Sequence, residues 1–249
     1  MRIEIRPTAA DAAAFAAREV AAALRRQPRL TLGLPTGRTS IAFYDALVRL
    51  HRAGRADFRR ARSFNLDELA GLGARDPRSY RSFMREHLFS HINLPAARAH
   101  LLDGAARDWR RALARFESAL ARAGGLDVVV LGIGRNGHVA FNEPADRLVT
   151  GCHRVRLTRP TREANAYVFD GNWRRVPAHG LTMGMGTVLG ARRIVLLATG
   201  PRKAAIVRRA FAGPITTRVP ASLLQAHPDV LIVCDADAAR ALARPRSTR

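Results

Sequence analysis

A short apolar run over residues 126–131, rich in β-branched side chains and followed at once by glycines, predicts a buried central strand. Similar short runs predict further strands over residues 3–5, 30–34, 62–66, 100–102, 152–157, 193–198 and 228–234. Between these runs, apolar residues recur three to four positions apart, which indicates helices. The predicted helices cover residues 8–24, 41–50, 78–91, 108–123 and 235–242, with a loop entering a short helix over 181–189 and a helix opening at 199–203.

Strands that alternate with helices imply a mostly parallel, twisted sheet with helices on both faces, which is a three-layer, Rossmann-like α/β fold. The length of 249 residues, 47% of them hydrophobic, suits a single domain over residues 1–249. Residues 158–180 are polar and aromatic and follow neither period cleanly, so we expect them to form a small lid segment. We expect the tail, residues 243–249, to be frayed.

The formal net charge of +22 raises the question of nucleic acid or a membrane surface as a partner. Lys203 is the only lysine, so the other basic residues among the 42 are arginines, spread over the whole chain. No nucleic-acid motif accompanies them and no apolar run reaches membrane-spanning length, so we expect neither partner. Cys152 and Cys234 form no disulfide framework, and the charged N-terminus lacks a signal peptide's apolar run. Both features predict a cytoplasmic protein.

The loop after the central strand carries an imidazole, a carboxylate and two amides within eight residues. These are Asn136, His138, Asn142 and Glu143. Because open α/β sheets bind ligands at the carboxyl ends of their strands, this composition indicates an active site. The alternative is a glycine turn with a structural histidine, which the neighbouring Glu143 and Asn136 make the poorer interpretation.

The three glycines of this loop also spell the G-x-G-x-x-G pattern of dinucleotide sites. Pro144 follows too soon for the loop to open a helix directly, and no acidic residue ends a strand about twenty residues further on. We therefore expect no nicotinamide cofactor. His87 and His91 lie four residues apart, but no acidic pattern completes a metal signature, so we expect no metal.

Two further segments predict a phosphate site. Thr36, Gly37, Arg38 and Thr39 lie between a strand and a helix, an arrangement that offers backbone N–H groups and hydroxyls to a phosphate. An ordinary strand-to-helix turn is an equal alternative. Lys203 begins a helix after a buried strand, and its survival among so many arginines indicates a position where a compact ammonium is required.

Asp67 and Glu68 are adjacent carboxylates at the end of the strand over residues 62–66, where packing explains them poorly. Their side chains point to opposite sides, so only one can face the loop carrying His138. If these strand ends meet at one edge of the sheet, the Gly/Thr loop and lysine suit a phosphate monoester. The carboxylate and the His/Glu pair then suit proton transfer on a sugar.

Seven segments together resemble glucosamine-6-phosphate deaminases, in the same order and at matching spacing over nearly the whole chain. They are LGLPTGRTS, FNLDELAGL, RSYRSFMREHLF, GIGRNGHVAFNEP, LTRPTREAN, LTMGMGT and LLQAHPDVLIVCD. The GHVAFNEP and FNLDE blocks are the most specific. The sister family of 6-phosphogluconolactonases shares the fold but has no F-N-E-P block after the Gly-His. The resemblance implies a cofactor-free conversion of glucosamine 6-phosphate and water to fructose 6-phosphate and ammonia.

The resemblance also implies roles for particular residues. Asp67 would remove the C2 proton and return it to C1, and Glu68 would contact substrate. His138 would open the pyranose ring, with Glu143 and Asn136 holding its imidazole. The phosphate-binding residues would be Thr36, Gly37, Arg38, Thr39, Arg162 and Lys203.

One departure and three alternatives remain. Many relatives carry Asp where this chain has Asn136, and an amide can orient an imidazole but cannot balance its charge. The alternatives are a lactonase, an isomerase of another hexosamine phosphate, and a sugar-phosphate-sensing regulator. The family match begins almost at residue 1 with no DNA-binding segment before it, which argues against a regulator. The sequence leaves the oligomeric state open, a homo-oligomer included.

Overall fold

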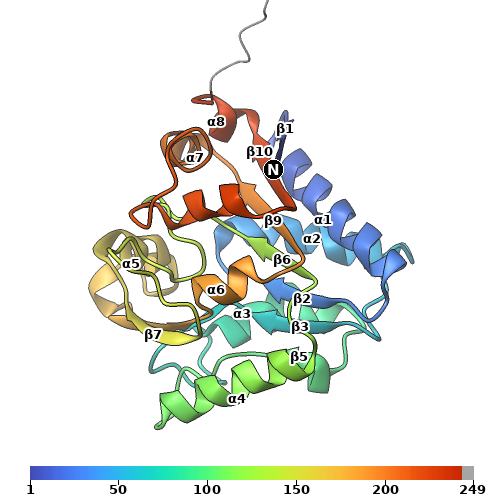
Figure 1. The fold of residues 1–249 in the computed structure, drawn as a ribbon. Helices are drawn as coiled ribbons and strands as arrows, with labels where there is room; N and C mark the ends of the chain where they lie inside the picture. The colour runs from blue at the N-terminus through green and yellow to red at the C-terminus, as the bar shows by residue number, and fades with distance from the viewer. Residues whose placement is uncertain (243–249) are drawn as a thin grey trace, which may run out of the picture.

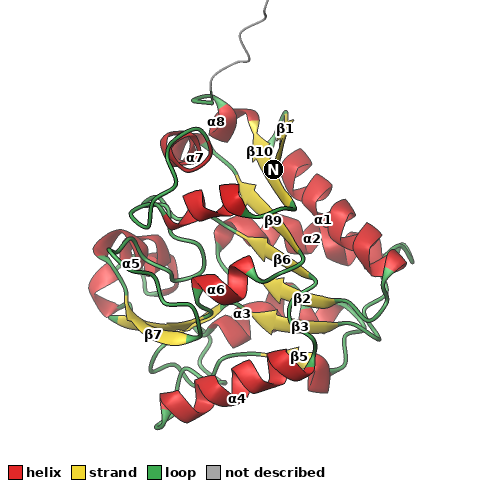
Figure 2. Cartoon of the chain, viewed as in Figure 1, coloured by secondary structure: helices red, strands yellow, loops and turns green. Residues whose placement is uncertain are grey.

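The structure is a computed structural model that describes residues 1–242, so the expected frayed tail, 243–249, lies outside the described residues. Seven strands form a parallel sheet in the order β1-β10-β9-β6-β2-β3-β5, with β6 in the centre (Figure 2). The strands are β1 (Arg2–Arg6), β2 (Thr31–Leu34), β3 (Arg62–Asn65), β5 (Ala99–His100), β6 (Val128–Leu131), β9 (Arg193–Ala198) and β10 (Val230–Asp235).

Helices cover both faces of this sheet (Figure 1). One face is covered by α1 (Ala9–Arg26), α2 (Arg38–Arg52) and α3 (Tyr80–His87). The other is covered by α4 (Trp109–Arg122), α6 (Met185–Leu189), α7 (Ala204–Phe211), α8 (Ala236–Ala239) and the 3₁₀ helix η6 (Pro220–Ala226). The predicted three-layer α/β fold, with β6 as its central strand, is confirmed.

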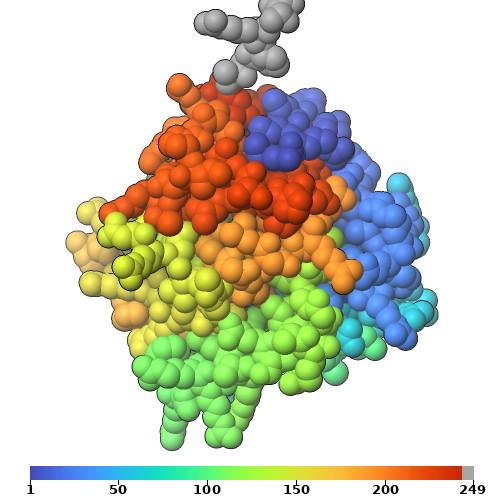
Figure 3. All heavy atoms as spheres, in the orientation of Figure 1, coloured from blue at the N-terminus to red at the C-terminus, as the bar shows by residue number. Residues whose placement is uncertain are grey.

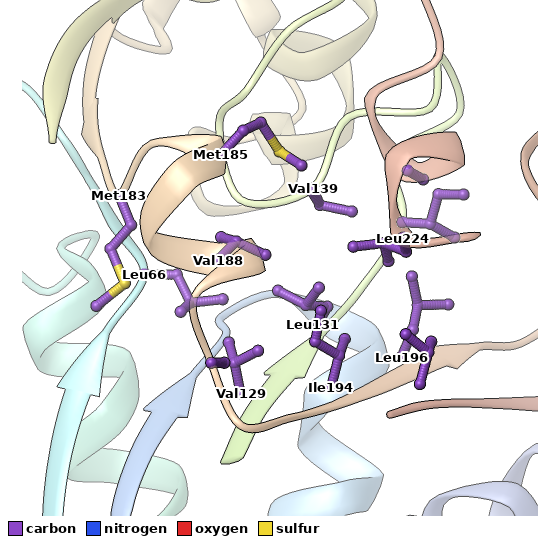
Figure 4. Packing of buried hydrophobic residues seen from close by; sticks show 14 of the residues in the cluster. Leu66, Val129, Leu131, Val139, Met183, Met185, Val188, Ile194, Leu196 and Leu224 are labelled. Atoms are coloured by element: carbon purple, nitrogen blue, oxygen red, sulfur yellow. The ribbon is translucent and has the colours of Figure 1, made fainter. Parts of the chain in front are cut away.

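Alternate residues of the inner strands supply two separate apolar cores. In β6, Val129 and Leu131 face the core beneath α6 and α7, whereas Val128 and Val130 face the core beneath α1 and α2. Figure 4 shows side chains of the first core, with Leu131 and Leu196 lying between the sheet and Leu224 of η6. Because these strands are buried on both faces, they are continuously apolar in sequence, and this is why they were predictable.

A second, small sheet departs from the sequence prediction. It is antiparallel, in the order β4 (Asp67–Leu69), β8 (His179–Thr182), β7 (His153–Arg156). The strand predicted over residues 152–157 therefore lies outside the main sheet. The loop predicted to begin at Leu181 is instead strand up to Thr182. These strands are short and β7 is half exposed, so their sequences carry no continuous apolar run.

The segment 158–180 packs on this small sheet. It contains α5 (Arg159–Asn165) and the 3₁₀ helices η3 (Ala166–Val168) and η4 (Trp173–Arg175). Its Phe169 and Val176 form a third apolar cluster with Leu69 of β4 and with Phe141 of the loop after β6. In Figure 3 this part of the chain, drawn in yellow, lies against the orange and red atoms of the C-terminal third.

Helix boundaries follow capping chemistry. The Thr8 hydroxyl accepts a hydrogen bond from the Asp11 N–H at 3.1 Å, and the Asp108 carboxylate accepts one from the Arg111 N–H at 3.0 Å. The helix predicted over residues 78–91 is shorter than expected: Ser79 caps α3, which ends at His87, and the 3₁₀ helices η1 (Phe89–His91) and η2 (Ala96–Arg98) follow.

Candidate active site

A cavity of about 300 Å³ lies at the carboxyl edge of the main sheet. Loops that follow β2, β3, β6 and β9 line it, together with residues of α5 and η3. Parallel strands bring their carboxyl ends to one edge, so residues far apart in sequence meet there. The predicted site residues among its lining are Thr36, Gly37, Arg38, Thr39, Asp67, Asn136, His138 and Lys203.

The turn after β2, residues 35–39, lines the cavity. Gly37 caps α2 with φ of 107°, a left-handed conformation that favours glycine. The first N–H groups of α2, those of Arg38 and Thr39, have no partner within the helix and carry the positive end of its dipole. Such a helix start favours an anion, and the phosphate site expected at this turn stays a prediction.

Lys203 also lines the cavity, at the end of the 3₁₀ helix η5 (Pro201–Lys203). Its ammonium donates a hydrogen bond to the Ile133 carbonyl, which fixes the side chain. Burial and then the positive charges of Arg135 and Arg38 lower the pKa of Lys203 to about 8. A bound anion would offset that repulsion.

Arg38 is held by a residue that sequence reasoning missed. Its guanidinium lies over the Tyr167 ring, 5.2 Å from the ring centroid. Tyr167 belongs to η3, inside the expected lid segment, and it lines the cavity. This cation–π contact joins the start of α2, next to the turn after β2, to segment 158–180. The aromatic character of that segment was visible in the sequence, but its partner was not.

Asp67 is the buried carboxylate of the cavity, with 7% of its surface exposed. Burial, and then the charge of Glu68, raises the pKa of Asp67 to about 8. The Thr36 hydroxyl, 3.5 Å from its Oδ1, opposes this only in part. A carboxylate with so little solvation is a stronger base than one in water.

Glu68 lies on the opposite side of β4 and does not line the cavity. Its carboxylate accepts hydrogen bonds from the N–H groups of Leu69, Tyr80 and Arg81 at 2.9, 2.9 and 3.1 Å, so it caps the start of α3. Burial raises its pKa to about 7 although these N–H groups oppose the shift. The structure therefore gives Glu68 a local structural position and does not bring it to the cavity.

Arg162 likewise points away from the cavity. Its guanidinium donates to the carbonyls of Val176 and Arg174 at 2.8 to 3.0 Å, and it lies over the Trp173 ring. It lines a separate cleft on the outer side of α5. The structure thus separates Arg162 from the cavity and from the turn after β2. Two arginines that were not predicted as site residues, Arg135 and Arg202, line the cavity.

His138 packs against bare backbone. A Cβ added to Gly134 would lie 2.2 to 2.5 Å from atoms of the His138 ring, so only glycine leaves room for the imidazole. His138 Nδ1 lies 3.6 Å from Glu143 Oε2 and 3.2 Å from Thr161 Oγ1. The G-x-G-x-x-G pattern of this loop therefore accommodates an imidazole in this structure.

Glu143 is buried behind His138, and several donors stabilise its charged form. The Asn136 amide donates to Oε2 at 2.7 Å and the Thr158 N–H donates to Oε1 at 3.0 Å. Burial raises the pKa of Glu143, but His138, the Thr161 hydroxyl and the Thr158 N–H lower it more, so that the pKa is about 2. The Asn136 side chain contacts the Glu143 carboxylate and not the imidazole ring. Its Oδ1 accepts a hydrogen bond from the backbone N–H of His138 at 3.2 Å.

Among residues 1–242, no three His, Cys, Asp or Glu side chains form a group that could hold a metal ion. His87 and His91 therefore belong to no such group. None of the helices in this part of the chain combines the length and apolar character needed to cross a membrane.

The fold and this edge of the sheet define the chain as an α/β protein of the sugar-phosphate isomerase class. It belongs to the family described as glucosamine-6-phosphate isomerases/6-phosphogluconolactonase, whose model matches residues 6–233.

Relatives within this family are close and nearly full length. The chain is 41% identical to a glucosamine-6-phosphate deaminase of Halothermothrix orenii, over 97% of this chain and 100% of that one. A solved monomeric glucosamine-6-phosphate deaminase superposes with a TM-score of 0.93 at 38% identity, over 97% and 100% of the two chains. The 6-phosphogluconolactonase of Trypanosoma brucei, at 21% identity and a TM-score of 0.74 over 97% and 98%, shares the fold.

The contact between Gly134 and the imidazole leads to a first prediction. Gly134→Ala should displace the His138 ring and destabilise the protein by about 1–3 kcal/mol through overpacking. At roughly 2–4 °C per kcal/mol, calorimetry would detect this as a lower melting temperature. Gly132→Ala is the matched control, because a Cβ there meets nothing within 4 Å. Equal melting temperatures for the two variants would contradict the packing argument.

Proposed function

We propose that this protein is a glucosamine-6-phosphate deaminase, which converts glucosamine 6-phosphate and water to fructose 6-phosphate and ammonia. The observation that carries the proposal is a buried carboxylate, Asp67, facing the same cavity as the imidazole of His138 and the phosphate turn. The names of relatives at 38 to 41% identity over nearly the full length support it.

The phosphate group would bind at the start of α2, on the N–H groups of Arg38 and Thr39, with Lys203 as the opposing cation. Helix N-termini and ammonium groups both favour a phosphate dianion. Binding at this end leaves the sugar ring directed toward Asp67 and His138, which line the same cavity. Tyr167, which belongs to the proposed lid, segment 158–180, would close over the phosphate together with the Arg38 side chain.

His138 would open the pyranose ring. Its Nε2 removes the proton of the C1 hydroxyl and returns a proton to the ring oxygen, which yields the open-chain aldehyde. Glu143, charged because its pKa is about 2, stabilises the imidazolium formed in between. An imidazole titrates near neutral pH, so it can both accept and donate the proton.

Asp67 would then act on the open chain. Its carboxylate removes the C2 proton while the C1 carbonyl oxygen takes a proton from the substrate's ammonium, which gives an enol, and Asp67 then returns the C2 proton to C1. The product is an imine at C2, which water hydrolyses to the ketone of fructose 6-phosphate with release of ammonia. Burial raises the basicity of Asp67, as removal of a weakly acidic C–H proton requires.

The alternative of a 6-phosphogluconolactonase has less support. Lactone hydrolysis removes no proton from carbon, so it gives no reason for a strongly basic buried carboxylate beside the imidazole. The neighbours named as 6-phosphogluconolactonases share only 17 to 21% of their residues with this chain, and such likeness carries the fold alone. The proposed compartment is the cytoplasm, in keeping with two free cysteines.

One assay tests the proposal directly. The purified protein with glucosamine 6-phosphate should release ammonia and fructose 6-phosphate in equal amounts, measured by coupled enzymatic detection of each product. 6-Phosphogluconolactone, offered as a second substrate, should be hydrolysed no faster than in buffer. Absence of ammonia above background would reject the deaminase.

Asp67→Asn should abolish exchange of the C2 hydrogen with solvent, because an amide cannot take a proton from carbon. Mass spectrometry or NMR in deuterated water would follow deuterium incorporation, with a loss of about 10²-fold or more. Glu68→Gln is the matched control, because Glu68 is the neighbouring carboxylate but lies outside the cavity. This variant should still exchange the C2 hydrogen. Wild-type exchange in Asp67→Asn would show that another group is the base.

The pKa values of Asp67 and Lys203, both about 8, predict a narrow pH profile. Asp67 must lose its proton to act as a base, so kcat/KM should fall below pH 8. Lys203 must keep its proton to bind phosphate, so kcat/KM should also fall above pH 8. Each limb approaches about tenfold per pH unit, because kcat/KM reports the free enzyme.

Lys203→Arg separates the two limbs. Arginine stays charged throughout this range, so the variant should lose the Lys203 contribution to the alkaline limb while keeping the acid limb. Its larger planar head should raise KM, and Lys203→Ala should raise KM further. Titration of the substrate is common to all variants and cancels in the comparison. An unchanged alkaline limb and KM would remove Lys203 from the phosphate site.

A further inference from the structure

His138 is not within hydrogen-bond distance of the carboxylate that balances its charge. Nδ1 lies 3.6 Å from Glu143 Oε2, whereas Thr161 Oγ1 lies 3.2 Å from the same nitrogen. Thr161 Oγ1 in turn lies 3.1 Å from Thr158 Oγ1, and Thr158 Oγ1 lies 3.2 Å from both oxygens of Glu143. Two hydroxyls therefore connect the imidazole to the carboxylate.

The direction of this chain of hydrogen bonds follows from its end. An ionised carboxylate can only accept, so the Thr158 hydroxyl donates to Glu143. Because the Thr158 proton is used on Glu143, the 3.1 Å contact between the two hydroxyls is a hydrogen bond only with Thr161 as its donor. Thr161 Oγ1 is left as an acceptor, and His138 must supply the proton from Nδ1. The network thus specifies one tautomer, with Nδ1–H inward and Nε2 unprotonated.

An ordinary structural role explains these hydroxyls poorly. Thr158 is the N-cap residue of α5, yet its side chain makes no capping hydrogen bond to that helix and is directed at Glu143 instead. Thr161 is 1% exposed, and its hydroxyl contacts His138 and Thr158 and helps to lower the pKa of Glu143. Both threonines thus use their side chains on the His–Glu pair and not on their own helix.

We propose that Thr161, acting with Thr158, is a positioning residue that holds His138 in the Nδ1–H tautomer. Nε2 is then the free base that faces the sugar. The role in ring opening rests on the proposed deaminase function, whereas the tautomer does not. This chain of hydrogen bonds also depends on the position of α5, which carries Thr161. The Tyr80 hydroxyl holds α5 in place through a 2.8 Å hydrogen bond to Asn165. The chain of hydrogen bonds is complete only when α5 lies in this position.

The test compares Thr161→Val, which keeps the shape and removes the hydroxyl, with Thr161→Ser, which keeps the hydroxyl. Thr31→Val is the matched control, a buried threonine at the opposite end of β2. Three quantities are measured for each variant. They are the His138 tautomer by ¹⁵N NMR without substrate, kcat with glucosamine 6-phosphate, and the Ki of 2-amino-2-deoxyglucitol 6-phosphate, which has no ring to open. The His138 signals are assigned by their loss in His138→Gln.

We expect the wild type and Thr31→Val to show the Nδ1–H tautomer. Thr161→Val should populate the Nε2–H tautomer and lose kcat by roughly 10- to 100-fold, with Ki changed less than about twofold. Thr161→Ser should restore both the tautomer and kcat to within about threefold of the wild type.

Two results would overturn the inference. One is an unchanged His138 tautomer in Thr161→Val. The other is Thr161→Ser behaving like Thr161→Val, which would assign the effect to packing. Failure of the deaminase proposal is recognised separately: the wild type would then release no ammonia, while the tautomer comparison would still be measurable.

Discussion

The cost of burying a carboxylate without enough donors governs this active site. The protein meets that cost in opposite ways for two acids of one site. Burial raises the pKa of Glu143, but the His138 imidazole, the Thr161 hydroxyl and the Thr158 N–H lower it to about 2. Asp67 receives one long contact from Thr36, and its pKa rises to about 8. Environments that push the pKa values of two carboxyl groups apart in this way suit the two groups to different roles.

The main sheet makes such a contrast possible because it holds the site rigidly. Its inner strands are buried on both faces, and their alternating side chains lock β6 between two cores. The loops that follow these strands can then carry polar groups and left-handed glycines without loss of the fold, since the strands supply the packing. Gly37 and Gly134 illustrate the two uses of glycine here. The first allows a backbone turn at a helix start, and the second makes room for a ring.

The small antiparallel sheet and segment 158–180 complete the site from the other side. β4 places Asp67 toward the cavity and Glu68 toward α3, because successive side chains of a strand alternate. Segment 158–180 contributes Thr158 and Thr161 to the His–Glu pair, and Tyr167 to Arg38. A single segment therefore touches both the His138–Glu143 pair and Arg38 at the start of α2.

The sequence by itself determined the parallel α/β fold, the family and the loop that carries His138, because buried strands and glycine turns leave strong local patterns. It also predicted that only one of Asp67 and Glu68 could face the cavity. Tertiary structure decided which one, since strand alternation has no absolute direction until β4 pairs with β8. Only the tertiary structure separated Arg162 from the cavity and brought Thr161 to the imidazole. Both depend on how α5 packs against distant segments, and single side chains on a short polar helix leave no periodic signal in the sequence.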